Sequence, residues 1–325
     1  MKPSIRPVVW SPPPVRPLQP RAPLPPIRRL SLPALGEDVA IDSAGRLVCG
    51  LSNGQVVRIQ PERGAIETLV DTGGRPLGIE IDADGSLIVC DAKRGLLRVH
   101  PDTRKIEVLA DPSLEAINLC NNAAIARDGT IYFSDSSRRF PLEHWQADLV
   151  EHSGTGRLFR RSPDGTLEVL CGGLQFANGV ALAADESFVI VAETGAYRLT
   201  RVWLTGPRAG QRDVFHDTPG FPDNIASDDK GRIWVAVATP RNPTLDLLHR
   251  TPPILRKIMW RLPDRLQPKP ARTTCVLALD EDGEVVHALA GTSPSFHMIT
   301  GLRVRGDQLY VASLAESAIG VMTLP

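Results

Sequence analysis

Residues 37–48 read EDVAIDSAGRLV, and residues 77–88, forty positions later, read LGIEIDADGSLI. Each stretch contains a short alternating strand, a turn with Asp and Gly, and a second apolar strand, which is the pattern of a β-hairpin. Four further copies keep this pattern, the last with a one-residue ambiguity: NNAAIARDGTIY from Asn121, NGVALAADESFV from Asn178, DNIASDDKGRIW from Asp223 and TGLRVRGDQLY from Thr300. A period of about forty residues indicates a repeat architecture.

Two more strand-like runs follow most copies of the hairpin, for example Gln55–Ile59 with Ala65–Val70, and Gly156–Arg160 with Thr166–Leu170. Four strands in each of six units predict an all-β fold, a six-bladed β-propeller whose blades surround a central channel. A β-sandwich would explain the strands and turns, but not six copies in one register. We assign residues 31–325 to this propeller.

The first thirty residues contain ten prolines and no acidic residue, so we expect 1–30 to be a Pro-rich arm. Such a segment is extended on the surface or disordered, and an alternative is a docking arm for a partner. It lacks the continuous apolar run of a signal peptide. No apolar run reaches the length of about 18 residues that a transmembrane helix needs.

The charge balance and the cysteines restrict the class of protein further. Lys and Arg together number 37, as do Asp and Glu, so the net charge gives no reason to expect nucleic acid as a partner. The five cysteines form no CxxC pair, and four of them lie in apolar runs. We therefore expect buried, reduced thiols and a cytoplasmic protein.

One position of the repeat carries a candidate metal site. The first strand of each propeller blade lines the channel, so equivalent positions form a ring, here Glu37, Leu77, Asn121, Asn178, Asp223 and Thr300. Asn and Asp are depleted in strands and each alone is also typical of a turn, but four carboxylate or carboxamide residues in one register favour a metal. We predict Glu37, Asn121, Asn178 and Asp223 as ligands, with Asn224 as a fifth ligand or as a partner of one. Oxygen ligands favour Ca²⁺, with Mg²⁺, Mn²⁺ and Zn²⁺ as alternatives.

Two insertions, 138–155 and 240–272, follow the second strand of a blade, on the face where the predicted ligands lie. The first contains Phe140, His144, Trp145 and His152. The second predicts a helix with Thr251 as N-cap and Pro252 at its first position. Its apolar residues are Ile254, Leu255, Ile258, Met259 and Leu262, with Arg256, Lys257 and Arg261 largely on the other face. The helix over 251–262 is expected to cap the metal site, to contact a membrane surface peripherally, or to pack against the propeller.

The chemistry that fits this site is hydrolysis of a small molecule. Nucleophile-elbow, zinc-protease, P-loop and dinucleotide-binding motifs are all absent from the sequence. A channel cation acts as a Lewis acid on a carbonyl group, so we expect a metal-dependent hydrolase of lactones or related esters. The general base is expected to be His297, three residues before the sixth inner strand, or Asp223. His297 is equally typical of a structural histidine on a blade connection.

Four stretches resemble a known family: Arg75-Pro-Leu-Gly-Ile, and the residues 121–137, 176–198 (FANGVALAADESFVIVAETGAYR) and 219–236 (PGFPDNIASDDKGRIWVA). Over about residues 33–325 the chain is similar to the strictosidine synthase-like branch of the gluconolactonase, senescence-marker and paraoxonase superfamily, and to the adipocyte plasma-membrane-associated proteins. The resemblance implies a six-bladed propeller with a channel metal, usually calcium. The family's metal-site residues match Glu37, Asn121 with Asn122, Asn178, and Asp223 with Asn224.

The chain departs from its better-known relatives at two functional positions. Leu77 stands where paraoxonase-type enzymes carry a catalytic His, so their His-based mechanism does not transfer. Residues 296–302 (FHMITGL) contain no Glu, which true strictosidine synthases use in this segment. Two alternatives to the hydrolase therefore stay open: a binding or scaffold propeller with a structural metal, and a condensing enzyme with another acid–base group.

Overall fold

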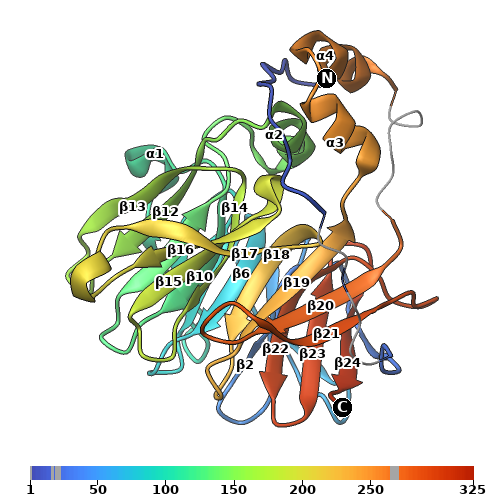
Figure 1. Cartoon of the computed structure of the whole chain (residues 1–325). Helices are drawn as coiled ribbons and strands as arrows, with labels where there is room; N and C mark the ends of the chain where they lie inside the picture. The colour runs from blue at the N-terminus through green and yellow to red at the C-terminus, as the bar shows by residue number, and fades with distance from the viewer. Residues whose placement is uncertain (1, 16–17, 19–22, 264–270) are drawn as a thin grey trace.

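The computed structural model describes residues 2–15, 18, 23–263 and 271–325. Within them the strands form six four-stranded antiparallel sheets, arranged as the blades of a propeller (Figure 1). The predicted all-β, six-bladed fold is therefore confirmed.

Each of the first three blades contains four strands that are consecutive in the chain. The bounds, blade by blade, are β2 (Ala40–Ile41), β3 (Leu47–Gly50), β4 (Gln55–Ile59), β5 (Ile66–Asp71); β6 (Pro76–Ile81), β7 (Leu87–Asp91), β8 (Gly95–His100), β9 (Lys105–Ala110); and β10 (Cys120–Ile125), β11 (Ile131–Asp135), β12 (Gly156–Arg161), β13 (Leu167–Leu174).

Blades four and five follow the same order, whereas the sixth blade combines strands from both ends of the chain. The bounds are β14 (Ala177–Leu182), β15 (Phe188–Glu193), β16 (Arg198–Trp203), β17 (Arg212–Asp217); β18 (Gly220–Ser227), β19 (Ile233–Pro240), β20 (Thr274–Leu279), β21 (Val285–Gly291); and β22 (Ile299–Arg305), β23 (Gln308–Ser313), β24 (Ala318–Thr323), β1 (Arg28–Ser31).

Strand β1 closes the ring, because it pairs antiparallel with β24 from Arg28 opposite Val321 to Ser31 opposite Ala318. The propeller thus includes three residues that the sequence analysis placed in the N-terminal arm. The sixth blade is therefore held together by pairing between the two ends of the chain, whereas each of the other five is built from consecutive strands.

The turn of each repeat needs one residue with positive φ. Gly85, at φ 81°, donates its N–H to the carbonyl of Asp82 in the hairpin between β6 and β7. In the fourth repeat Glu186 occupies this position at φ 59° and donates to the carbonyl of Ala183. The left-handed region is costly for residues other than Gly, Asn and Asp, so the repeated Gly follows from the turn geometry.

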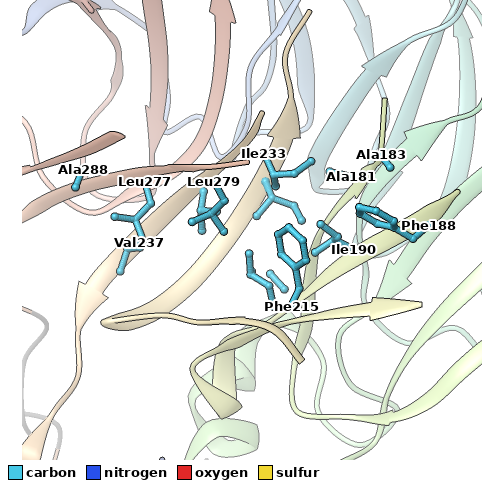
Figure 2. Close-up of a cluster of buried hydrophobic side chains, with 14 residues drawn as sticks. Ala181, Ala183, Phe188, Ile190, Phe215, Ile233, Val237, Leu277, Leu279 and Ala288 are labelled. Carbon is cyan, nitrogen blue, oxygen red and sulfur yellow. The ribbon is translucent and has the colours of Figure 1, made fainter. Parts of the chain in front are cut away.

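The core consists of apolar layers between neighbouring blades. Figure 2 shows the layer between the fourth and fifth blades, where Phe188 and Ile190 face Ile233 and Leu279. On the channel side the blades approach more closely. A Cβ atom on Gly179 would lie 2.3 Å from the backbone nitrogen of Ile225 in the next blade, so a larger residue does not fit there.

Three helices lie together beyond one face of the propeller, beside the N-terminus and opposite the C-terminus (Figure 1). They are α2 (Trp145–Glu151) in the first insertion, and α3 (Pro243–His249) and α4 (Pro253–Arg261) in the second. The other short elements of the described residues are α1 (Pro112–Glu115), η1 (Leu142–His144), η2 (Thr194–Ala196) and η3 (Gly206–Arg208). We call the described residues of the two insertions, 138–155, 240–263 and 271–272, the lid.

Two details of the predicted helix are wrong. The N-cap is Pro252 rather than Thr251, whose hydroxyl instead donates to the carbonyl of Leu248 at the end of α3. The packed face of α4 also differs from the apolar one, because Arg256 is fully buried while Ile254 and Ile258 are 57 % and 56 % exposed. The buried guanidinium is tolerated because three backbone carbonyls and a histidine nitrogen accept from its two terminal nitrogens.

All five cysteines are free thiols; four are buried and Cys275 is partly exposed. None of the helices in the described residues is long and apolar enough to cross a lipid bilayer.

Candidate metal centre

The structure brings four of the predicted ligands together around one cavity. Glu37, Asn121, Asn178 and Asp223 all line a cavity of about 520 Å³ that opens beneath the lid. They come from the first, third, fourth and fifth blades, each at or just before the inner strand. All four are at least nine-tenths buried.

The two asparagine amides are oriented by hydroxyl groups. Asn121 Nδ2 donates to Ser136 Oγ at 2.9 Å, and Asn178 Nδ2 donates to Thr194 Oγ1 at 3.2 Å. Thr194 in turn donates its proton to the carbonyl of Pro222 at 2.7 Å, so its oxygen is left as an acceptor for the amide. With each NH₂ group engaged in this way, both amide oxygens are available to the cavity.

Each of the four residues has a buried oxygen atom that lacks a hydrogen-bond partner in the described part of the chain. These atoms are Glu37 Oε2, Asn121 Oδ1, Asn178 Oδ1 and Asp223 Oδ1. Buried acceptors without partners are costly, and they cluster where a ligand or an ion supplies the missing contact.

Burial also disfavours the charged form of both acids. It raises the pKa of Asp223 to about 8. Burial, with the nearby carboxylates of Asp223 and Asp38, raises the pKa of Glu37 well above its ordinary value. A divalent cation would offset this repulsion, and hard oxygen donors of this kind suit Ca²⁺. The described residues contain no metal-holding group of three or more His, Cys, Asp and Glu, so a site here depends on the two amides.

Asn224 does not line the cavity. Its Nδ2 donates to Glu37 Oε1 at 2.9 Å, which fixes the carboxylate of Glu37 and leaves Oε2 free. Asn122 has a similar place one layer below the site, where its Nδ2 donates to Asp38 Oδ2 at 3.2 Å and its Oδ1 accepts from the N–H of Val180 at 2.9 Å. Asn224 thus joins the fifth blade to the first, and Asn122 joins the third blade to the first and to the fourth, so both cross-link the blades at the channel and orient the residues of the site.

The other two ring positions supply no side-chain oxygen to the cavity. Leu77 lines its wall, and Thr300 donates its hydroxyl to the carbonyl of Glu37 at 2.7 Å. The structure does not bring His297 to the site either. His297 Nδ1 lies 2.6 Å from Glu316 Oε1, and its neighbour Met298 lines the cavity instead.

Arg75 is a cavity-lining residue that sequence reasoning left without a role. It directly precedes β6, lines the same cavity as the four oxygens, and interacts electrostatically with Glu37. Burial lowers its pKa, but a guanidinium remains charged at neutral pH. The signal in the sequence was the Arg75-Pro-Leu-Gly motif, which was used only to recognise the family.

The lid supplies much of the cavity wall, through Trp145, Leu149, Leu245, Met259 and Trp260 among others. Leu149 packs with Leu77 and Phe176 of the propeller, so α2 is anchored on the rim of the channel.

The N-terminal arm (described residues 2–15) joins the two insertions of the lid. Ile5 is buried against Phe140, Val150 and Trp260, and Trp10 stacks on His152 with ring centroids 4.0 Å apart. The backbone N–H of Trp10 donates to the carbonyl of His249 at 2.9 Å.

Arg256 lies at the centre of this junction. Its guanidinium donates to the carbonyls of Val8, Val150 and Glu151 and to His249 Nδ1. One side chain thereby links the arm, α2, α3 and α4.

Comparison with known proteins identifies the family. Residues 49–242 match the family described as SMP-30/Gluconolactonase/LRE-like region, and residues 29–59 match Strictosidine synthase-like, N-terminal. Protein STRICTOSIDINE SYNTHASE-LIKE 13 of Arabidopsis thaliana is 34 % identical over 289 residues, which are 78 % of this chain and 71 % of that protein. Adipocyte plasma membrane-associated protein of Rattus norvegicus is 35 % identical over 250 residues, 70 % of this chain and 66 % of that protein.

Solved structures share the fold at low sequence identity. A gluconolactonase from Xanthomonas campestris superposes with a TM-score of 0.66 at 20 % identity, covering 96 % of this chain and 99 % of that one. Regucalcin from Agrobacterium tumefaciens, a calcium-binding protein, gives 0.67 at 16 % identity, covering 94 % and 96 %. The chain therefore belongs to the SMP-30/gluconolactonase/LRE-like family and, as its repeat motifs indicated, to the strictosidine synthase-like branch.

Proposed function

We propose that the protein is a metal-dependent hydrolase of lactones or related esters, with Ca²⁺ as its metal. The observation that carries the proposal is the set of four unpartnered oxygens, from Glu37, Asn121, Asn178 and Asp223, at one end of a cavity large enough for a small molecule. That a gluconolactonase and a calcium-binding protein share the fold supports the same assignment.

The four oxygens would hold the cation, which when bound supplies Lewis-acid polarisation of the substrate carbonyl group. The protein's own residues do the rest. Asp223 presents an oxygen to the cavity; it would accept the proton of the attacking water and return it to the alkoxide oxygen that is released when the acyl C–O bond of the substrate breaks. Arg75 is the charged group placed to stabilise negative charge that develops on the substrate oxygen. His297 faces Glu316 rather than the cavity, so we assign the base to Asp223.

A structural role for the metal is favoured by one observation. The four ligand residues come from four different blades, so a bound ion would tie these blades together at the channel. In a scaffold propeller the ion would stabilise the fold without turnover. The third reading, a condensing enzyme, predicts product from an amine and an aldehyde.

Turnover separates these readings. Aliphatic and sugar lactones are assayed with the metal-stripped protein and after addition of Ca²⁺, Mn²⁺ or Zn²⁺, for the wild type and Asp223→Ala. We expect hydrolysis that requires metal and is lost in the variant. Metal-independent hydrolysis, or full activity in Asp223→Ala, would refute the proposal. No turnover despite a chelator-sensitive melting temperature would favour the scaffold.

We also propose that the lid touches an anionic membrane surface through α4. Ile254 and Ile258 of α4 and Leu247 of the preceding α3 are more than half exposed, and Lys257 and Arg261 lie beside the two isoleucines in α4, which contains no acidic residue. Apolar residues flanked by basic ones suit an interface that carries negative lipids. Co-sedimentation with phosphatidylserine vesicles should fall in Ile254→Ser; binding equal to wild type would contradict the contact.

A further inference from the structure

Resting on the hydrolase proposed above, we infer that the cavity takes lactones or esters with a large apolar body and selects against polyhydroxylated sugar lactones. The four unpartnered oxygens and Arg75 lie at the channel end of the cavity, and the other polar side chains of the lining are Gln146, Thr194, Thr239, Arg241 and Asn242. The channel end suits a single lactone or ester group. The rest of the lining determines what the remainder of the substrate must be.

Away from the oxygen ligands, most of the lining is apolar. The propeller contributes Leu77, Phe176 and Phe221, and the lid contributes Trp145, Leu149, Leu245, Leu248, Met259 and Trp260. These side chains come from every helix of the lid and from three blades. A substrate group placed among them is surrounded by carbon atoms, which favours alkyl or aromatic groups over hydroxyls.

Three polar side chains in the lining are already engaged with the protein. Thr194 donates to the carbonyl of Pro222, as described above. Arg241 pairs with Asp246 at 2.9 Å and donates to the carbonyl of Pro13 at 2.7 Å. The Asn242 side chain accepts from the N–H groups of Thr244 and Leu245 at the start of α3. A sugar hydroxyl beside Thr194 would have to displace these bonds, and Arg241 and Asn242 could only donate to a hydroxyl, through the N–H groups that the contacts above leave free.

The size of the cavity agrees with a substrate larger than a single sugar ring. Its volume of about 520 Å³ lies within the range of roughly 300–1,000 Å³ that is typical of pockets for drug-sized ligands. Each methylene moved from water into an apolar wall should raise kcat/KM or affinity by about fourfold. Each hydroxyl buried without a partner should lower it by at least about fivefold.

The test compares γ-valerolactone, γ-nonalactone and γ-undecalactone with glucono-δ-lactone, using the Ca²⁺-loaded full chain in vesicle-free buffer. We expect kcat/KM to rise by about fourfold per methylene until the alkyl chain fills the cavity. Gluconolactone should be hydrolysed at least about a hundredfold less efficiently than γ-undecalactone. A preference for gluconolactone, or no dependence on chain length, would overturn the inference and leave the hydrolase proposal standing.

A pair of variants on α4 supplies the matched control. Met259 lines the cavity, whereas the adjacent Ile258 is 56 % exposed. Met259→Ser should lower kcat/KM for γ-undecalactone about tenfold and leave γ-valerolactone nearly unchanged, and Ile258→Ser should change neither. Equal effects of the two variants would contradict the assigned wall.

Binding measured without turnover keeps the inference separate from the proposed reaction. Trp145 and Trp260 line the cavity, so tryptophan fluorescence of the metal-stripped protein reports on occupancy. Tighter binding of γ-undecalactone than of γ-valerolactone, weakened in Met259→Ser, would support the apolar ligand class even if no lactone is hydrolysed. Equal binding of the two lactones would overturn it.

Discussion

Replacing Arg256 by Met should release the arm from the lid while leaving the propeller folded. The guanidinium is fully buried and donates to Val150 O at 3.0 Å and His249 Nδ1 at 2.9 Å, and also to the carbonyls of Val8 and Glu151. Met keeps much of the volume but leaves these acceptors without a donor. Hydrogen bonds to a charged group are worth about 1.5–3 kcal/mol each, and breaking a buried charged network costs about 3–5 kcal/mol. We therefore expect the junction to lose about 3 kcal/mol, or roughly 150-fold in its opening equilibrium.

Hydrogen exchange measured by mass spectrometry on peptides from the arm tests this value. The N–H groups of Val8 and Trp10 donate to the carbonyls of Glu151 and His249, so their protection reports on closure. Protection in Arg256→Met should fall by about two orders of magnitude. The control is Lys257→Met, the exposed neighbour on the same helix, which should exchange as the wild type does. Equal protection in both variants would refute the assignment of Arg256 as the link between arm and lid.

Three further predictions concern the site, the junction and the channel. Asn178→Leu should abolish the rise in melting temperature that Ca²⁺ produces, because the variant loses one of the four unpartnered oxygens. The control Asn53→Leu, at an exposed position, should keep that rise. A rise that persists in Asn178→Leu would contradict the ligand set. Burial beside Arg256 lowers the pKa of His152 and His249 to about 3 while the arm is closed on the lid. Below about pH 6.5 the open state, in which the arm has left the lid, therefore binds more protons than the closed state. The free energy of closing the arm should then weaken by up to about 1.4 kcal/mol per pH unit for each imidazole. Arm protection, corrected for intrinsic exchange, should therefore fall from pH 6.5 to 5, and constant protection would contradict this. Gly179→Ala should lower the free energy of unfolding by about 2 kcal/mol or more, because the added Cβ atom would collide with the backbone of the next blade. The loss is measured as a lower midpoint of urea unfolding. An unchanged midpoint would show that the two blades separate easily at this position.

The fold and the ring could be predicted because the repeat fixes equivalent positions. Once the hairpins are aligned, Glu37, Asn121, Asn178 and Asp223 must lie at one level of the channel, and local spacing is sufficient to show it. Asn224 was predicted as a fifth ligand or as a partner of one, but the sequence does not show that its Nδ2 donates to Glu37, because this contact joins the fifth blade to the first.

The lid could not be derived in this way because its contacts join distant segments. The amphipathic pattern of residues 254–262 shows an apolar stripe but not which face packs. Arg256 is buried because carbonyls 106 and 248 positions away in the chain, those of Val150 and Val8, accept its N–H groups. Arg75 was passed over for a similar reason, since its role depends on the carboxylate of Glu37 from another blade.

Calorimetric titration of Ca²⁺ into the metal-stripped protein tests the central claim most directly. Because burial raises the pKa values of Glu37 and Asp223, binding near pH 7 should release protons, and the measured heat should depend on the ionisation enthalpy of the buffer. The account predicts one ion bound per chain, proton release on binding, and loss of the binding heat in Asp223→Ala. The absence of binding to the wild type, or unchanged binding in Asp223→Ala, would contradict it.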